Sequence, residues 1–324
     1  MQTQVPDGLI WYPDDQPGIV RKRAGRGFSY VAPDGTRIDN RDERKRIEAL
    51  AVPPAYEKVW ISPRTNGHLQ ATGYDARTRK QYRYHPDFSA FRARHKFDDL
   101  ATFGALLPRI RRRVHNALTE TQGDEVFAVA AALRLIDRAS LRVGTPDYAE
   151  DNKTYGATTL RGRHLRIKDG VLHLCYSGKG GQRVRKRLSD RTLQRALEKM
   201  QDLPGGDLMQ FRDARGHLSQ LGPEHVNRWL EEVTGRPELT AKTFRTWNGS
   251  VAALSAALAS DTPVTIKAMA SAAAKTLHNT ASIARNSYIH PAVIDLAGQQ
   301  RLPEVPEGPT GLRQAERGLM ALLA

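Results

Sequence analysis

Tyr288 lies in the segment RNSYIHP, where its neighbours are mostly polar. A tyrosine that only fills a core normally lies among apolar residues at helical spacing. A phenol, with a pKa of ~10, is a poor nucleophile unless cations favour the phenolate or the leaving group is assisted. If Tyr288 attacks a phosphodiester, arginine forks suit the charge that develops on the nonbridging oxygens. The alternative for Tyr288 is a packing role at an internal interface.

Three cations elsewhere in the chain lie where a local element can hold them. Arg142 follows an apolar helical segment in ASLRVGTPDY, Lys179 lies in the glycine-rich turn YSGKGGQ, and Arg245 lies near the head of a helical segment in TAKTFRTWNGS. Each alone is also typical of a solvated surface charge. Their joint pattern carries more information than any one of them.

The positive charge of the chain is concentrated in its middle third. Of a net charge of +15, residues 91–200 contribute most, with 23 basic and 12 acidic side chains, whereas residues 201–324 carry 12 of each. A folded basic surface is typical of a polyanion partner, most often nucleic acid. A soluble basic enzyme without such a partner is the alternative.

Composition argues against several other classes of protein. The single cysteine, Cys175, excludes an internal disulfide and a cysteine metal cluster, and we expect it to be a small core residue of the strand GVLHLCYSG. No apolar run approaches the ~20 residues of a membrane span, and the N-terminus lacks the pattern of a secretory signal. The motif GKGG lacks the spacing of a nucleotide phosphate loop, and the acidic residues form no metal constellation. We therefore expect a cytoplasmic protein that needs neither metal nor nucleotide.

The hydrophobic pattern predicts an α+β protein with elements that change type along the chain. Residues 1–90 predict a β-rich domain with turns at Asp34-Gly35 and Asn66-Gly67. Residues 91–300 predict a mainly helical domain, interrupted over 158–188 by a small antiparallel sheet with turns near 168–170 and 178–181. Residues 301–324 predict a tail with a short helix.

Four segments in this order resemble the type IB DNA topoisomerases, in particular the small bacterial and poxvirus-like members. They are LRVG, YSGKGG, KTFRTW and HNTASIARNSY, and the stretch VPPAYEKVWISPRTNGHLQATGYDARTRKQYRYHPDF is similar to the DNA-clamping domain of the bacterial members. The resemblance spans about residues 8–298. Tyrosine recombinases share the pattern of cations and tyrosine, but they usually have a histidine three positions before the second arginine, where this chain has Lys242.

The resemblance implies a role for each candidate. Arg142 and Arg245 match the arginines that hold the scissile phosphate, Lys179 matches the hairpin lysine that protonates the leaving 5′-oxygen, and Tyr288 matches the nucleophile. Nine positions before the tyrosine most members have a histidine, and this chain has Asn279. A carboxamide N–H can also donate to a phosphate oxygen.

The spacing between Asn279 and Tyr288 makes a further prediction. Nine residues of one straight helix are 2.5 turns, which would put the two side chains on opposite faces. Both can face one phosphate only if the helix breaks, and Thr280 is a suitable N-cap for a second helix. His278 would take the role of Asn279 if the alignment shifted by one residue.

The resemblance also implies DNA contacts in the N-terminal domain and beside Arg245. The candidates are Tyr74, Arg77, Lys80, Gln81, Tyr82, Arg83, Tyr84 and Lys242. On a strand, Lys80, Tyr82 and Tyr84 share one face, while the donors Gln81 and Arg83 share the other and suit base edges. A solvated edge strand is the alternative, and the run RIRRR (109–113) is either a backbone-contacting or a solvated helix face.

Together these features predict a monomeric clamp around duplex DNA that relaxes supercoils through a 3′-phosphotyrosyl intermediate, associated with the nucleoid and without ATP, metal or other cofactor. A site-specific tyrosine recombinase and a noncatalytic architectural DNA-binding protein are the alternatives.

Overall fold

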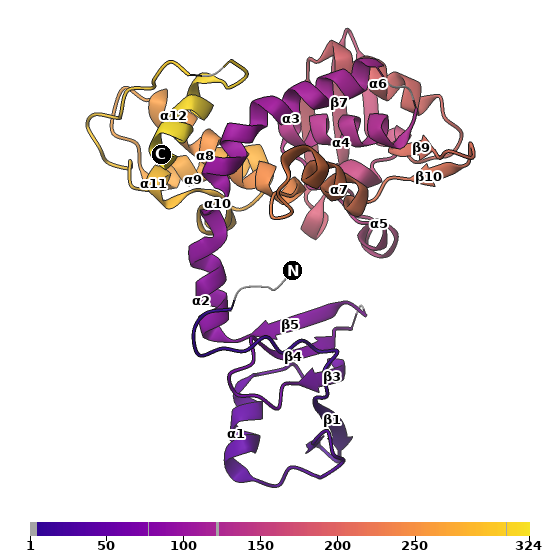
Figure 1. Ribbon diagram of the computed structural model, residues 1–324, viewed down its shortest axis with the longest axis vertical. Helices are drawn as coiled ribbons and strands as arrows, with labels where there is room; N and C mark the ends of the chain where they lie inside the picture. The colour runs from indigo at the N-terminus through magenta and orange to yellow at the C-terminus, as the bar shows by residue number, and fades with distance from the viewer. Residues whose placement is uncertain (1–4, 77, 121–122, 309) are drawn as a thin grey trace. The chain divides into compact units, whose positions relative to one another are not determined.

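The computed structural model describes residues 5–76, 78–120, 123–308 and 310–324. The chain divides into two compact units, residues 1–96 and 97–324, each with its own hydrophobic core. The first is built around a sheet and the second mainly from helices, so the predicted α+β class is confirmed (Figure 1). Within the described ranges, we find no helix that combines the length and the apolar character needed to cross a membrane.

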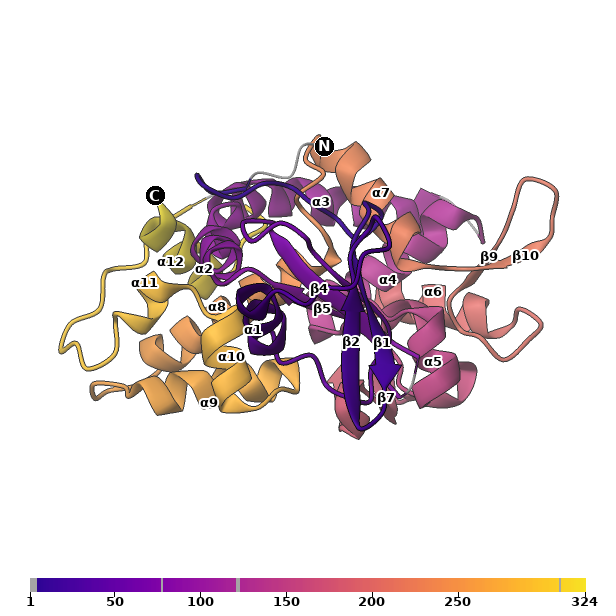
Figure 2. The same cartoon turned by 90° about the horizontal axis from the view of Figure 1, so that it is seen from below.

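The N-terminal unit is a five-stranded antiparallel sheet with one helix against it. Its elements are β1 (Ile19–Ala24), β2 (Gly27–Val31), α1 (Arg41–Ala49), β3 (Glu57–Ile61), β4 (Leu69–Tyr74), β5 (Lys80–Tyr84) and α2 (Pro86–Arg94), followed by the short 3₁₀ segment η1 (His95–Phe97). The strand order is β2-β1-β3-β4-β5. Ile47 of α1 packs against Ile19, Val59 and Ile61 of the sheet, and α1 lies beside β1 and β2 in Figure 2.

Both of the turns that the sequence predicted in this unit are present. Asn66-Gly67 lies between β3 and β4, as the sequence predicted. Asp34-Gly35 also forms a turn, in which the amide of Gly35 donates to the carbonyl of Ala32 at 2.9 Å. The chain then returns along the free edge of β2, where it forms an antiparallel bridge between Val31 and Arg37, while the other edge of β2 pairs with β1.

The C-terminal unit contains most of the helices and two small sheets. Its elements are α3 (Leu100–Glu120), α4 (Glu125–Ala139), α5 (Pro146–Asn152), η2 (Ala157–Thr159), η3 (Gly162–His164), β6 (Leu165–Lys168), β7 (Val171–Ser177), η4 (Lys179–Gly181), β8 (Arg183–Leu188), α6 (Arg191–Gln201), β9 (Gln210–Arg212), β10 (Leu218–Gln220), α7 (Pro223–Thr234), α8 (Ala241–Leu258), α9 (Ile266–Leu277), α10 (Ala281–Tyr288), α11 (Pro291–Ile294) and α12 (Gln314–Leu323). Helix α4 is buried along most of its length and packs against α3, α6, α7 and α8.

The predicted sheet within residues 158–188 is present as β6-β7-β8. Asp169 and Gly170 form the β6–β7 turn with positive φ angles of 50° and 72°. On the inner face of β7, Leu172, Leu174 and Tyr176 are buried in the core. The prediction for Cys175 is wrong, because alternation along β7 places this residue on the outer face, where it is exposed.

The C-terminal helix α12 is joined to the core by a buried ion network. Arg111 of α3 donates to Asp137 of α4 at 2.9 Å and to Glu316 of α12 at 2.7 Å. Glu316 is fully buried, and its carboxylate also accepts from the amide of Arg313 at 2.7 Å. Arg111 therefore points inward, unlike the exposed Arg112 of the same basic run, so RIRRR is not one uniform surface face.

Candidate active site

The helix break that the sequence predicted separates α9 from α10. Helix α9 ends at Leu277, and His278 takes a left-handed conformation with φ of 50°. Thr280 then caps α10, because its side chain accepts from the amide of Ile283 at 3.2 Å. One straight helix would put Asn279 and Tyr288 on opposite faces. The break changes the direction of the chain between them, so both side chains can face the same region.

Arg142 lies in an extended segment whose backbone is hydrogen-bonded to the backbone of residues 157–158. The amide of Ala157 donates to the carbonyl of Arg142 at 2.7 Å, next to Gly156. A Cβ on Gly156 would lie 2.6 Å from that carbonyl oxygen, so only glycine permits this approach. From this segment the Arg142 guanidinium donates to Oδ1 of Asn279. Asn279, rather than His278, is therefore the residue in direct contact with Arg142.

Arg245 is almost fully buried, with 3% of its surface exposed, on the first turn and a half of α8. Its guanidinium donates to the carbonyl of Ser140, which ends α4 in a left-handed conformation, and to the carbonyl of Leu277 at 2.9 Å. Its Nε has no hydrogen-bond partner among the described residues. The guanidinium carbon lies 5.2 Å from the centroid of the Tyr288 ring.

Tyr288 is half-buried at the last position of α10, where α8 holds its backbone. The Ser250 hydroxyl donates to the carbonyl of Tyr288 at 3.3 Å and accepts from the amide of His290 at 2.9 Å. A Cβ on Gly249 would lie 2.5 Å from the same carbonyl oxygen. Sequence reasoning missed Gly249, although a glycine inside a helical segment is a recognised signal of close packing.

The site is strongly cationic. Burial, followed by the charge of Arg142, lowers the pKa of Arg245 to about 10, and contacts with Tyr288 only partly oppose this. Burial and then the charge of Arg245 lower the pKa of Lys186 to about 8. His278 also has a lowered pKa, through burial and then the charges of Lys186, Arg245 and Arg142. A phosphate placed here would relieve this mutual repulsion.

A second tyrosine, Tyr176, lines the same pocket as Arg142 and Arg245. It is 6% exposed, and burial raises its pKa although both arginines oppose the shift. Its phenol is therefore held in the neutral form within the core. Of the two tyrosines, only Tyr288 combines contact with Arg245 and a partly exposed position.

Lys179 lies at the exposed tip of the β7–β8 hairpin. The pocket lined by Arg142, Arg245 and His278 reaches Gly178, the residue before Lys179. The two residues after it, Gly180 and Gly181, both have φ of 74°. The structure thus brings Arg142, Arg245, Asn279 and Tyr288 together and leaves Lys179 beside them, on a turn whose conformation favours glycine.

Lys242 is exposed on the first turn of α8, one turn before the buried Arg245. It therefore reaches the surface at the head of the helix that anchors the site.

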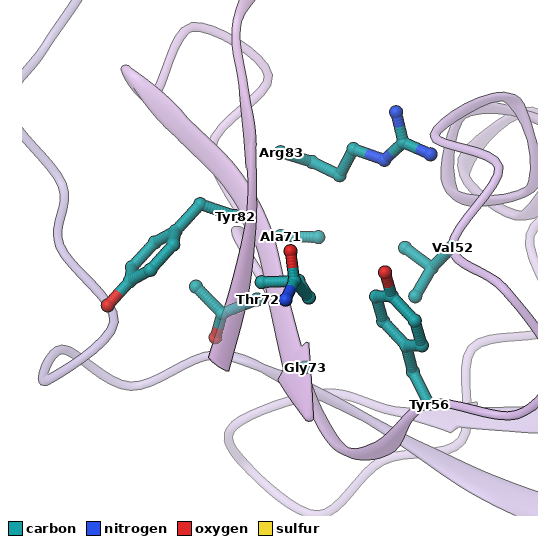
Figure 3. A pocket seen from close by; sticks show the side chains of 8 residues that line it. Val52, Tyr56, Ala71, Thr72, Gly73, Tyr82 and Arg83 are labelled. Carbon is teal, nitrogen blue, oxygen red and sulfur yellow. The ribbon is translucent and has the colours of Figure 1, made fainter. Parts of the chain in front are cut away.

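The predicted alternation along β5 is present. Tyr82 stacks on Tyr84 with ring centroids 6.0 Å apart, and the Lys80 ammonium lies 5.6 Å from the Tyr82 ring. Figure 3 shows Tyr82 and Arg83 leaving the strand in opposite directions, Arg83 toward Val52.

Several of these side chains already have partners within the unit. Lys80 forms an ion pair with Asp14 at 2.6 Å, and Gln81 donates to Asp75 at 3.1 Å. Arg83 donates to the carbonyl of Ala51 at 3.3 Å and borders a cavity of about 260 Å³. Tyr74 packs under the ammonium of Lys58, at 5.9 Å.

Arg77, the remaining candidate in this stretch, lies outside the described residues.

Comparisons with known proteins agree with this architecture. A family model described as "Bacterial DNA topoisomerase IB, N-terminal domain" matches residues 27–75, and one described as "Eukaryotic DNA topoisomerase I, catalytic core" matches residues 85–288. The chain is 27% identical over 293 residues to DNA topoisomerase 1B of Acanthamoeba polyphaga mimivirus, which covers 86% of this chain and 87% of that protein. It is 28% identical over 176 residues to DNA topoisomerase 1 of Mycosarcoma maydis, which covers 49% of this chain and 17% of that protein. The chain belongs to the type IB DNA topoisomerase family.

Proposed function

We propose that this topoisomerase relaxes supercoiled duplex DNA by two transesterifications at Tyr288. The phenolic oxygen attacks a backbone phosphorus and forms a 3′-phosphotyrosyl bond, and the 5′-oxygen leaves with a proton. The freed end rotates about the intact strand, and the 5′-hydroxyl then attacks the phosphotyrosyl bond and reseals the backbone. Because the covalent link preserves a phosphodiester-like bond, the cycle needs neither ATP nor a metal ion.

The observation that carries this proposal is a cluster of donors in which Arg245 lies against the Tyr288 ring, Arg142 lines the same pocket as Arg245, and Asn279 contacts Arg142. Arg142 and Arg245 are fixed by backbone contacts, and Asn279 is fixed by Arg142. Such preorganised donors stabilise charge that develops on nonbridging oxygens without reorganising during the reaction. Lys179 has the chemistry of the general acid for the leaving 5′-oxygen, and its hairpin would move toward the phosphate when DNA binds.

The remaining parts of the proposal concern binding. Both units bind one duplex, as a monomer that closes on DNA like a clamp. The N-terminal unit contributes the side chains of β5. When DNA binds, Lys80 leaves its ion pair with Asp14 and Gln81 leaves its hydrogen bond with Asp75, and both contact DNA instead. The basic middle third of the chain contributes phosphate contacts, so affinity falls steeply with salt.

A plasmid relaxation assay in EDTA without ATP tests the activity, with Tyr288→Phe as the matched variant. We expect the wild type to relax the plasmid and to form a covalent DNA complex that survives denaturation. The phenylalanine variant loses one hydroxyl and no charge, so it should bind duplex DNA with unchanged affinity. It should neither relax the plasmid nor form the covalent complex. Relaxation by this variant would exclude Tyr288 as nucleophile, and recombined rather than relaxed products would favour a recombinase.

A further inference from the structure

Lys186 is a partly buried cation that the proposed reaction leaves without a role. It lies on β8 opposite Leu174, and it faces the core side of the β6–β8 sheet with Val184. Apolar side chains fill most of this inner face, so an ammonium is out of place there on packing grounds alone. Its Nζ donates to the carbonyl of Thr276 at 2.7 Å, in the last turn of α9.

The last turn of α9 is held by cations from two different elements. Lys186 of β8 donates to the carbonyl of Thr276, and Arg245 of α8 donates to the next carbonyl, that of Leu277. Two residues later, the side chain of Asn279 accepts from Arg142. The final carbonyls of a helix lack intrahelical partners and carry partial negative charge, so cations are favourable there.

We propose that Lys186 is a positioning residue for the transesterification, acting by anchoring the end of α9 so that Asn279 and Arg245 stay in register with Tyr288. The inference rests on the function proposed above, because it assigns Lys186 to the same reaction. In this role Lys186 does not contact the phosphate. It fixes the position of the last turn of α9, and that turn positions Asn279 and Arg245.

Stability alone does not account for a charge at this position. Burial and the charge of Arg245 lower the pKa of Lys186 to about 8, which means that the folded protein disfavours its protonated form. An apolar side chain of similar length would occupy the same space without the cost of burying a charge. An ammonium whose charged form is disfavoured by burial, yet which bonds the last turn of α9 beside the helix break, is best explained by the geometry that it maintains.

The experiment compares Lys186→Met, Lys186→Arg and, as a control, Lys168→Met, which changes an exposed lysine of the same sheet. For each purified full-length protein we would measure the melting temperature, the Kd for a duplex, and the single-turnover rate of covalent complex formation. The rate assay uses saturating protein and a suicide DNA substrate that cannot be resealed.

We expect the methionine variant to keep its melting temperature and to bind duplex within about twofold of the wild type. Its rate of covalent complex formation should fall at least about tenfold, the arginine variant should recover most of that loss, and Lys168→Met should match the wild type. A wild-type rate in Lys186→Met would overturn the proposal, and so would a methionine variant that is unfolded at the assay temperature, which would assign Lys186 to stability. If the wild type itself binds DNA but forms no covalent complex, the proposed function fails instead.

Discussion

The Arg142 guanidinium donates a hydrogen bond to the side-chain oxygen of Asn279, a residue 137 positions further along the chain. Because a guanidinium has only donors, the Asn279 amide must present its oxygen to Arg142 and its nitrogen elsewhere. That nitrogen, Nδ2, is buried and has no partner among the described residues. An unsatisfied buried donor beside a cationic pocket is suited to an incoming phosphate oxygen.

This orientation predicts losses of different size for two substitutions at position 279. Asn279→Asp still accepts from Arg142, but it loses the N–H and places a negative charge near the phosphate. We expect the single-turnover cleavage rate to fall about 10²–10³-fold, the usual effect of losing one oxyanion donor. Asn279→His keeps an N–H and should lose less than about tenfold. An aspartate variant as fast as the histidine variant would show that Asn279 does not donate to the phosphate.

Gly249 predicts a packing requirement for Tyr288. A methyl group there would lie 2.5 Å from the carbonyl oxygen and 2.9 Å from Cβ of Tyr288, so α10 must shift away from α8. We expect Gly249→Ala to lower the free energy of unfolding by about 1–3 kcal/mol and to slow cleavage by at least about tenfold. Denaturant unfolding and covalent complex formation are the measurements. Gly206→Ala, at an exposed glycine with open space around it, is the control and should change neither.

Lys179 can be distinguished from the arginines by the chemistry of the leaving group. A general acid matters most when the leaving oxygen needs a proton, whereas a thiolate leaves without one. We expect Lys179→Ala to cleave a strand with a bridging 5′-sulfur at close to the wild-type rate, and Arg142→Ala and Arg245→Ala to stay slow on it. If sulfur rescues Arg142→Ala and not Lys179→Ala, then Arg142 is the acid and Lys179 only a phosphate contact.

The network around Glu316 predicts that α12 stabilises the catalytic unit. Glu316→Ala leaves Arg111 buried with one of its two carboxylates, and removing a partner from a buried ion pair costs ~3–5 kcal/mol. The exposed Glu307→Ala is the control and should leave the free energy of unfolding unchanged. Equal stability of the two variants would mean that α12 adds nothing to the core.

The same carboxyl gives a pH dependence. Burial raises the pKa of Glu316, but the hydrogen bond and charge of Arg111 outweigh burial and hold it below its ordinary value of 4.5. Its contribution to stability is therefore complete above pH ~4.5 and is lost as the pH falls through the lower folded value. Thermal unfolding of the wild type and Glu316→Gln should converge as the pH falls below ~4.5, and a constant difference would contradict this linkage.

Local sequence signals predicted several structural features of this protein. The break between α9 and α10 was predictable, because Thr280 caps a helix through contacts within four residues. The turn at Asp169-Gly170 was predictable for the same reason. The candidate residue types were also readable, because a tyrosine nucleophile acting on a phosphodiester would require cations.

Only the tertiary structure decided which face of an element each side chain takes and which segments meet. Cys175 and Lys186 were misjudged or missed, because alternation along a strand is visible in sequence but the choice of the buried face depends on what packs against it. Arg111 contacts α12, an element far along the chain, so nothing local in the run of arginines separates it from its exposed neighbours. A glycine inside a helical segment marks close packing at Gly249, but only the fold shows that α10 is the element that packs there. The sequence thus carries the candidate residue types and the local breaks, whereas long-range packing selects the neighbours that hold Tyr288.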